Sequence, residues 1–182
     1  YDPIYAAAQQ LGVAIGFHTG TSADSLGGQR FRKFLSAHTI DHPAEQMMAL
    51  IATIIGGVFE RFPRLSIGFL ESGIGWVPYM MDRLDEEVEK RGAVEAPYLT
   101  KLPSEYVKSG RIYFGVECEE KTIPDAMRWG LEDTILYSSD YPHWDGDWPH
   151  TVKAIRDRKD LSDTTKQKML HDNVARFYKF NE

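Results

Sequence analysis

Four short apolar segments along the chain have the length and composition of buried strands. They cover residues 13–17, 65–70, 112–116 and 134–137, and each is rich in β-branched or aromatic side chains. The stretches between them carry apolar residues at the three- and four-residue spacing of helices. Strands that alternate with helices form βαβ units, so the pattern predicts an α/β fold with a parallel sheet.

Helices are predicted from this spacing and from the residues that begin and end it. Asp2 and Pro3 favour the start of a first helix, which Gly12 can end. The predicted helices cover residues 2–12, 41–62, 76–91, 123–129 and 162–178. Residues 20–37 contain three Gly and three Ser and are predicted to form a long loop, a kind of segment that often covers a site. Because no linker interrupts the chain, residues 1–182 are expected to form a single domain.

A polar residue with catalytic or metal-binding potential follows each apolar segment. His18 follows the first, Glu71 the second, Glu117 the third and Asp140 the fourth. In parallel α/β folds, ligands bind outside the carboxyl ends of the strands. A charged group in such a dry environment needs a partner, a metal or a substrate. His18 and Asp140 together offer the nitrogen and oxygen donors that suit zinc or another divalent ion.

Each of these residues also has a structural interpretation when it is taken alone. His18 could be a hydrogen-bonded core histidine, Asp140 could cap a turn, and Glu71 could cap the helix predicted near residue 76. Glu117 leads into two further glutamates, and a solvated acidic loop is the favoured interpretation there. The remaining histidines considered are expected to be capping or surface groups: His38, His42, His150 and His171.

Composition narrows the classes of partner. The 182 residues contain 21 Lys and Arg against 27 Asp and Glu, which gives a net charge of −6. This acidic balance argues against nucleic acid as a partner. The apolar stretches are far shorter than the ~20 residues that span a bilayer, so no membrane association is expected. The single cysteine, Cys118, excludes an internal disulfide framework and a cysteine-rich zinc site, and it favours a cytoplasmic location.

Five sequence phrases occur in a fixed order along the chain. They are GFHTG at 16–20, GVFERFPRL at 57–65, ESGIGWVP at 71–78, SDYPH at 139–143 and DNVARFY at 172–178. Together they resemble the amidohydrolase-related family of metal-dependent hydrolases, in the branch that includes aminocarboxymuconate semialdehyde decarboxylase and aromatic acid decarboxylases. The resemblance implies a distorted (β/α)8 TIM barrel in which the four apolar segments are strands five to eight.

A complete barrel needs about 250 residues, so the chain is expected to be the C-terminal part of one. Such a half barrel would have open edges near residues 13–17 and 134–137, and one uncovered sheet face. Either the missing N-terminal half or a second copy of the chain is therefore expected to cover these surfaces. The missing half is favoured, because the family takes further metal ligands from its first strand.

The resemblance also implies roles for individual residues. His18 matches the metal-binding histidine after strand five, and Asp140 matches the aspartate after strand eight that binds metal and moves the proton. The implied cofactor is a divalent ion, with zinc ahead of manganese. Glu71 stands where many members carry a histidine that polarises the substrate, and it is expected to take part in catalysis. His143, three residues after Asp140, is placed to orient the aspartate or the substrate, and a turn-stabilising role is equally open.

Three aromatic residues, Phe17, Tyr141 and Trp144, are predicted to lie near the same mouth. They could line an apolar pocket for the ring of a small-molecule substrate, or they could pack the loops. The implied activity is a metal-dependent hydrolase in which Asp140 acts as general acid and base on a metal-activated water. A non-oxidative decarboxylase of a small aromatic acid on the same metal site is the alternative. A metal-free, non-catalytic fragment is a second alternative.

Overall fold

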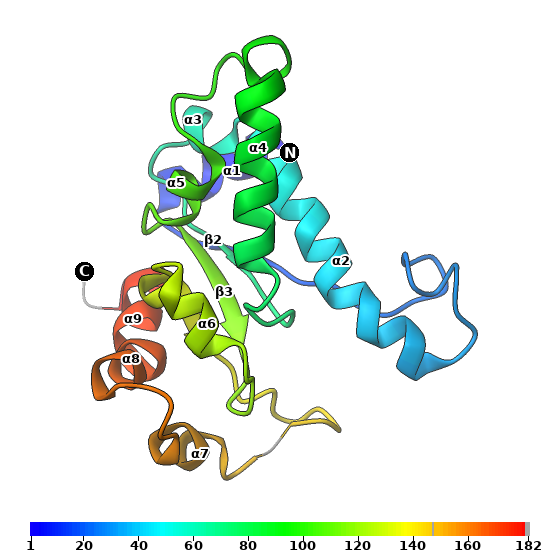
Figure 1. Cartoon of the computed structure of the whole chain (residues 1–182), viewed down its shortest axis with the longest axis vertical. Coiled ribbons are helices and arrows are strands. Elements are labelled where there is room, and N and C mark those ends of the chain that lie inside the picture. The colour runs from blue at the N-terminus through cyan, green and yellow to red at the C-terminus, as the bar shows by residue number, and fades with distance from the viewer. Residues whose placement is uncertain (147, 181–182) are drawn as a thin grey trace.

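The computed structural model describes residues 1–146 and 148–180 of the chain (Figure 1). Its centre is a sheet of four parallel strands in the order β1-β2-β3-β4, with bounds Ile15–Phe17, Ile67–Phe69, Ile112–Val116 and Ile135–Tyr137. Phe17 pairs with Phe69, and Phe69 pairs with Phe114, so the strands end at nearly the same level. The predicted α/β fold with a parallel sheet is confirmed, and each strand lies inside its predicted segment.

Helices lie before and after the strands. They are α1 Asp2–Leu11, α2 Phe34–Ile55, α3 Val58–Arg61, α4 Val77–Glu95, α5 Pro103–Val107, α6 Ile123–Arg128, α7 Thr151–Asp157, α8 Asp163–Gln167 and α9 Asn173–Tyr178. A 3-10 turn, η1 Glu132–Thr134, precedes β4, and a π-helical turn, η2 Lys168–Asp172, joins α8 to α9. Among the described residues, no helix combines the length and the apolar character needed to cross a bilayer.

The helix predicted over residues 41–62 differs from the structure at both ends. α2 already begins at Phe34, and Pro43 lies in its interior instead of at its start. Proline weakens a helix because it lacks an N–H and crowds the preceding turn, so it normally indicates a first position. At the other end, Gly57 has a φ of 68° and separates α2 from α3. The predicted final helix over 162–178 is likewise divided by η2.

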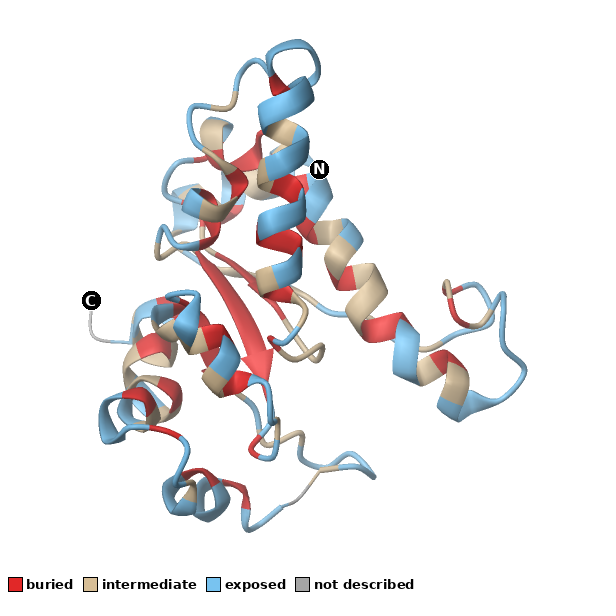
Figure 2. Cartoon of the chain, in the orientation of Figure 1, coloured by how far each residue is buried: buried red, intermediate tan, exposed pale blue. Residues whose placement is uncertain are grey.

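The main hydrophobic core lies between the sheet and the helices α2, α4, α5 and α6 (Figures 1 and 2). Alternate strand residues face it, including Ile67, Phe69 and Phe114, which are all fully buried. The rings of Phe17, Phe69 and Phe114 stack in sequence, with centroids 5.6 and 5.7 Å apart. Burial of such large aromatic side chains stabilises the sheet.

Helix α9 covers part of the opposite face of the sheet. Phe177 packs on Tyr113 with ring centroids 5.0 Å apart, and a Cβ at Gly68 would come within 2.9 Å of the Phe177 ring. Asn173 ties the same helix to the sheet, because its side-chain amide donates hydrogen bonds to the carbonyls of Glu132 at 3.0 Å and Ile135 at 2.9 Å. The expectation that this face is left uncovered is therefore wrong for the part beneath Phe177.

Candidate active site

Polar side chains from three strands meet at the carboxyl edge of the sheet. His18 directly follows β1, Glu71 lies two residues after β2, and Asp140 lies three residues after β4. All three line a cavity of about 200 Å³. The Nε2 atom of His18 contacts Oε2 of Glu71. The structure therefore brings His18, Glu71 and Asp140 to one cavity, whereas His143, the other residue predicted to be catalytic, is not among the described residues that line it.

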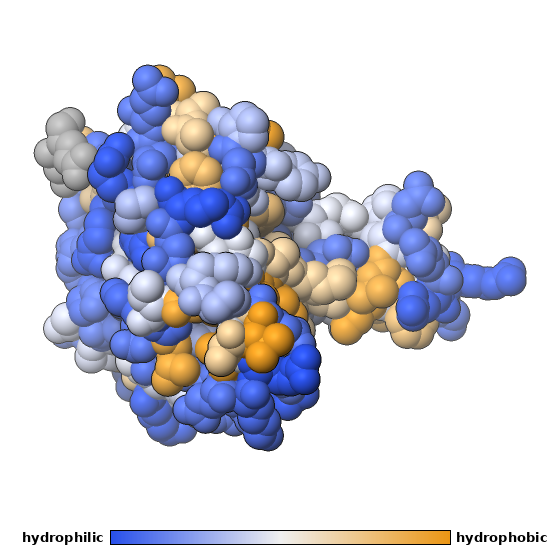
Figure 3. Space-filling model, turned by 90° about the horizontal axis from the view of Figure 1, so that it is seen from above, coloured by the Kyte–Doolittle hydropathy of each residue, from blue (hydrophilic) through white to orange (hydrophobic). Residues whose placement is uncertain are grey.

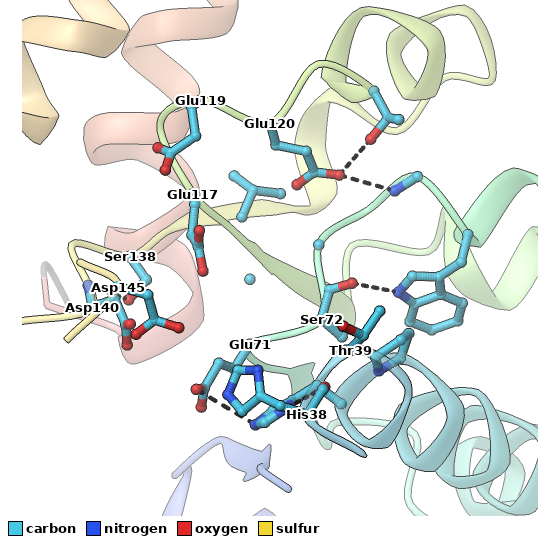
Figure 4. A pocket seen from close by; sticks show the side chains of 18 residues that line it. His38, Thr39, Glu71, Ser72, Glu117, Glu119, Glu120, Ser138, Asp140 and Asp145 are labelled. Atoms are coloured by element: carbon cyan, nitrogen blue, oxygen red, sulfur yellow. Dashed lines mark hydrogen bonds and ion pairs between the residues drawn. The ribbon is translucent and has the colours of Figure 1, made fainter. Parts of the chain in front are cut away.

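A larger cavity, of about 540 Å³, opens beside the first one (Figure 4). Glu71 and Asp140 line both cavities. No Lys or Arg is among the described residues that line the larger cavity. Six carboxylates line it, namely Glu71, Glu117, Glu119, Glu120, Asp140 and Asp145. Because carboxylates close together repel one another unless a cation offsets them, this wall is built to hold positive charge.

Both Glu71 and Asp140 have left-handed backbone conformations, with φ of 59° and 53°. Residues other than glycine rarely adopt this region, which costs about 1–2 kcal/mol. Such strain accumulates at functional sites, where the surrounding structure holds it in place. Here it occurs at Glu71 and Asp140, which both line the two cavities.

Burial raises the pKa of Asp140, and the nearby carboxylates of Glu71 and Asp145 raise it further, while His143 opposes the shift. His143 is also close in space, because its backbone N–H donates to the carbonyl of Asp140 at 2.8 Å. Ligand atoms of Glu71, Asp140 and His143 lie within 4.8 Å of one another. Two carboxylates and an imidazole suit a divalent ion.

The carboxyl group of Glu117 has the most strongly shifted pKa among the described carboxyl groups. Enclosure of this group in the cavity wall, followed by the charges of Glu119, Asp140, Asp145 and Glu120, raises its pKa to about 7. The residue as a whole is exposed, yet its carboxyl lines the larger cavity. The interpretation of Glu117 as part of a solvated acidic loop is therefore incomplete.

His38 and His42 also belong to this site, which corrects their assignment as capping or surface groups. Both lie in α2, one turn apart, and both line the larger cavity. His42 is only 6% exposed, and its Nε2 lies 3.5 Å from Oε1 of Glu71. The four-residue spacing of the two histidines could have indicated a shared face, had α2 been predicted to start at Phe34. His150 and His171 are exposed, as expected.

The three aromatic residues predicted to bind substrate have different surroundings. Phe17 packs on Phe69 within the core. Tyr141 and Trp144 are 63% and 70% exposed, and the Trp144 ring lies 6.0 Å from that of His38 at the cavity mouth. None of the three is among the described residues that line the two cavities. Their role in substrate binding stays a prediction.

A buried glutamine fixes the strand end that carries His18. Gln46 on α2 is 1% exposed, and its Nε2 donates to the carbonyl of Phe17 at 3.1 Å. This hydrogen bond holds the last residue of β1 against the helix that also carries His42. The positions of His18 and His42 are therefore linked through one buried side chain, which the sequence pattern does not reveal.

Glu120 and Arg158 hold the loops after β2 and β3. Oε1 of Glu120 accepts hydrogen bonds from the backbone N–H groups of Ile74 at 2.8 Å and Gly75 at 3.1 Å. Arg158 donates to the backbone carbonyls of Cys118 at 3.0 Å and Glu120 at 2.7 Å. These charge-assisted bonds position the acidic wall of the larger cavity.

Comparison with known proteins agrees with this architecture. A family model described as amidohydrolase matches residues 1–180. The chain belongs to the amidohydrolase family. One curated relative of this amidohydrolase, the 2-amino-3-carboxymuconate-6-semialdehyde decarboxylase of Dictyostelium discoideum, is 26% identical over 176 residues. The match covers 96% of the chain and 47% of the relative, and it confirms the resemblance inferred from the five sequence phrases.

Solved structures share the fold of this amidohydrolase. An amidohydrolase from Mycobacterium avium subsp. paratuberculosis has a TM-score of 0.77 at 25% identity, over 97% of this chain and 44% of its own. The 5-carboxyvanillate decarboxylase from Novosphingobium aromaticivorans, solved with bound manganese, has a TM-score of 0.73 at 24% identity, over 98% of this chain and 51% of its own. The chain thus spans about half the length of these relatives.

Proposed function

We propose that this amidohydrolase chain supplies strands five to eight of a (β/α)8 barrel, and that the completed barrel is a metal-dependent carboxy-lyase acting on a small carboxylic acid. The observation that carries the proposal is the meeting of His18, Glu71 and Asp140 on one cavity at the carboxyl edge of the sheet. In barrels of this kind, active sites lie at that edge. The match over nearly the whole chain to proteins named as decarboxylases supports the choice of reaction.

His18 and Asp140 would hold a divalent ion in the completed barrel. The donor chemistry fits, because the imidazole of His18 and the carboxylate of Asp140 both line the cavity of about 200 Å³, where Glu71 adds a second carboxylate and no Lys or Arg is among the described lining residues. Manganese bound in a structural neighbour favours that ion over the zinc expected from the sequence. Such an ion would supply the positive charge that holds the carboxylate and an adjacent oxygen of the substrate.

Asp140 is proposed to be the proton donor. As the bond between the substrate carbon and its carboxylate breaks and carbon dioxide leaves, that carbon takes a proton from the Asp140 carboxyl. His143 stabilises the turn after Asp140, because its backbone N–H donates to the Asp140 carbonyl. Glu71 lines the same cavity as Asp140.

The proposal is tested by incubating the longest protein that the gene encodes with aromatic acids labelled at the carboxyl group, and by measuring the labelled carbon dioxide released. The expected result is labelled carbon dioxide from the wild type and none from Asp140→Asn, while Asp163→Asn, an exposed carboxylate on α8, behaves like wild type. Hydrolysis of esters, lactones or amides without carbon dioxide release would contradict the carboxy-lyase and support the hydrolase interpretation. Absence of both activities, together with absence of bound metal, would support the non-catalytic interpretation.

A further inference from the structure

Two histidines and a glutamate beside the proposed active site have the arrangement of metal ligands. His38 and His42 lie one turn apart on α2, so both imidazoles project from one face of the helix. Their ring centroids are 4.7 Å apart. Glu71 reaches toward them from the end of β2, and ligand atoms of the three residues all lie within 4.8 Å of one another (Figure 4).

The distance between His42 and Glu71 fits two ligands of one ion better than it fits a hydrogen bond. Nε2 of His42 lies 3.5 Å from Oε1 of Glu71, whereas hydrogen bonds between nitrogen and oxygen have lengths of about 2.7–3.2 Å. Two ligands bound at about 2.0–2.2 Å with a tetrahedral angle between them lie about 3.3–3.6 Å apart. A cation between these two atoms would need little movement of either side chain.

The two oxygens of Glu71 face different histidines. Oε2 contacts His18, which the proposed function assigns to the first ion, while Oε1 faces His42. A second ion can therefore bind on the α2 side of Glu71 without taking the oxygen that faces His18. His42 is 6% exposed and sits in a helix anchored by buried Asp41 and Gln46, so the donor atoms on α2 are held in place.

The charge of the larger cavity calls for more than one cation. Its six lining carboxylates have no Lys or Arg among the described lining residues to offset them. One divalent ion offsets two negative charges, whereas six acidic side chains line this cavity. A second divalent ion in the same cavity reduces this repulsion.

We propose that His38, His42 and Glu71 form a second divalent-cation site, separate from the one assigned to His18 and Asp140, for a borderline ion such as Zn²⁺. Two imidazoles and one carboxylate are a donor set that zinc accepts. Three protein ligands leave the fourth position open to the cavity of about 540 Å³, as in zinc sites that bind water or substrate. This site lies wholly within the described residues and does not depend on the proposed completion of the barrel or on the proposed reaction.

Titration of the 182-residue chain with Co²⁺, followed by the visible absorption of the bound ion, tests the proposal. The wild type should bind one equivalent with the intense bands of four-coordinate cobalt, and added Zn²⁺ should displace it. His38→Asn and His42→Asn should each weaken binding by at least about tenfold, because loss of a ligand should cost no less than loss of a group that supports one. His171→Asn, an exposed histidine on η2, is the matched control and should titrate like wild type.

Two further comparisons separate this site from the proposed active site. Asp140→Asn should keep the cobalt bands, because Asp140 is not among the three ligands. If Asp140→Asn abolished the bands while the His38 variant kept them, the ion would lie at the other site, which would overturn this proposal and leave the proposed function standing. Absence of cobalt binding by the wild type would also overturn it. His42 is buried, so circular dichroism of His42→Asn should show whether this variant folds. If it does not fold, the cobalt titration of His38→Asn, at a half-buried position, decides between the outcomes.

Discussion

Acidic residues are concentrated at the carboxyl edge of the sheet, and this negative charge affects the pKa values of their side chains. Glu71 and Asp140 adopt strained backbone conformations there, and the carboxyl groups of Glu117 and Asp140 both have raised pKa values. Burial is the main cause for both, and neighbouring carboxylates add to it. Each of these groups is less stable as an anion in the folded chain than in water, so each one makes stability depend on pH.

We expect Glu117→Gln to stabilise the folded chain at pH 8 and to leave its stability nearly unchanged at pH 4. The pKa of Glu117 is raised from 4.5 to about 7 on folding. Below about pH 4.5 this carboxyl group is protonated in both the folded and the unfolded chain, so its contribution to stability is fully present. As the pH rises through 7, the folded chain must hold an unfavourable anion, and that contribution is lost. Glutamine does not ionise, so the variant avoids this loss of stability at high pH.

Thermal unfolding of the wild type and the Glu117 variant between pH 4 and pH 8 measures the difference. Glu89→Gln, an exposed glutamate on α4, is the control and should show no pH-dependent gain. A Glu117→Gln variant whose melting temperature follows that of the wild type across the whole range would show that the carboxyl group is freely solvated.

The elements that could be predicted from sequence were those with a clear period. Four apolar segments locate the four strands, and His18, Glu71 and Asp140, which lie one to three residues after the strands, line one cavity at the carboxyl edge. The start of α2 could not be predicted, because Pro43 resembles a first helical residue and residues 34–40 lack a strong apolar period. For that reason the two histidines on α2 were missed.

The early start of α2 is supported by contacts that lie far apart in sequence. Asp41 is fully buried, and its two oxygens accept hydrogen bonds from the backbone N–H of Gly27 at 2.5 Å and the hydroxyl of Ser25 at 2.8 Å. These bonds fold the loop before the helix back onto it. A sequence pattern contains no sign of such a pairing, because it depends on tertiary structure alone.

Replacement of Asp41 by Ala is expected to destabilise the chain by roughly 1–3 kcal/mol, because it leaves buried donors without an acceptor. Hydrogen exchange of the backbone amides in residues 22–31 should accelerate at the same time. Asp24→Ala, an exposed aspartate in the same loop, is the matched control and should change neither quantity. Unchanged unfolding by urea and unchanged exchange for Asp41→Ala would show that the loop is held by other contacts.

The molecule as a whole exposes two sheet edges and a group of apolar side chains. β1 and β4 are the edges of the sheet among the described residues. The start of α2 and the loop before it, residues 20–40, form an arm that projects from the body (Figures 1 and 3). Apolar residues are exposed on this arm, namely Phe31 at 47%, Phe34 at 57%, Leu35 at 72% and Ile40 at 39%. Monomers rarely leave such clusters in contact with water.

The isolated 182-residue chain is therefore expected to self-associate. Sedimentation velocity over a range of concentrations should show species larger than 20.8 kDa. Leu35→Glu on the arm should reduce this association, since it places a charge within the apolar cluster. Val94→Glu on α4, which is 77% exposed but distant in sequence from the arm, is the control and should leave it unchanged. A stable wild-type monomer at every concentration would contradict the expectation.

Asp140 and His18 are proposed to hold a divalent ion at the carboxyl edge of the sheet. Metal analysis of the longest gene product, purified with Mn²⁺ in the buffer, tests this most directly. We expect Asp140→Asn to keep the far-ultraviolet spectrum of the wild type and to bind one equivalent less of divalent metal, while Asp163→Asn should lose none. An Asp140→Asn variant that is folded and retains the full metal content of the wild type would contradict it.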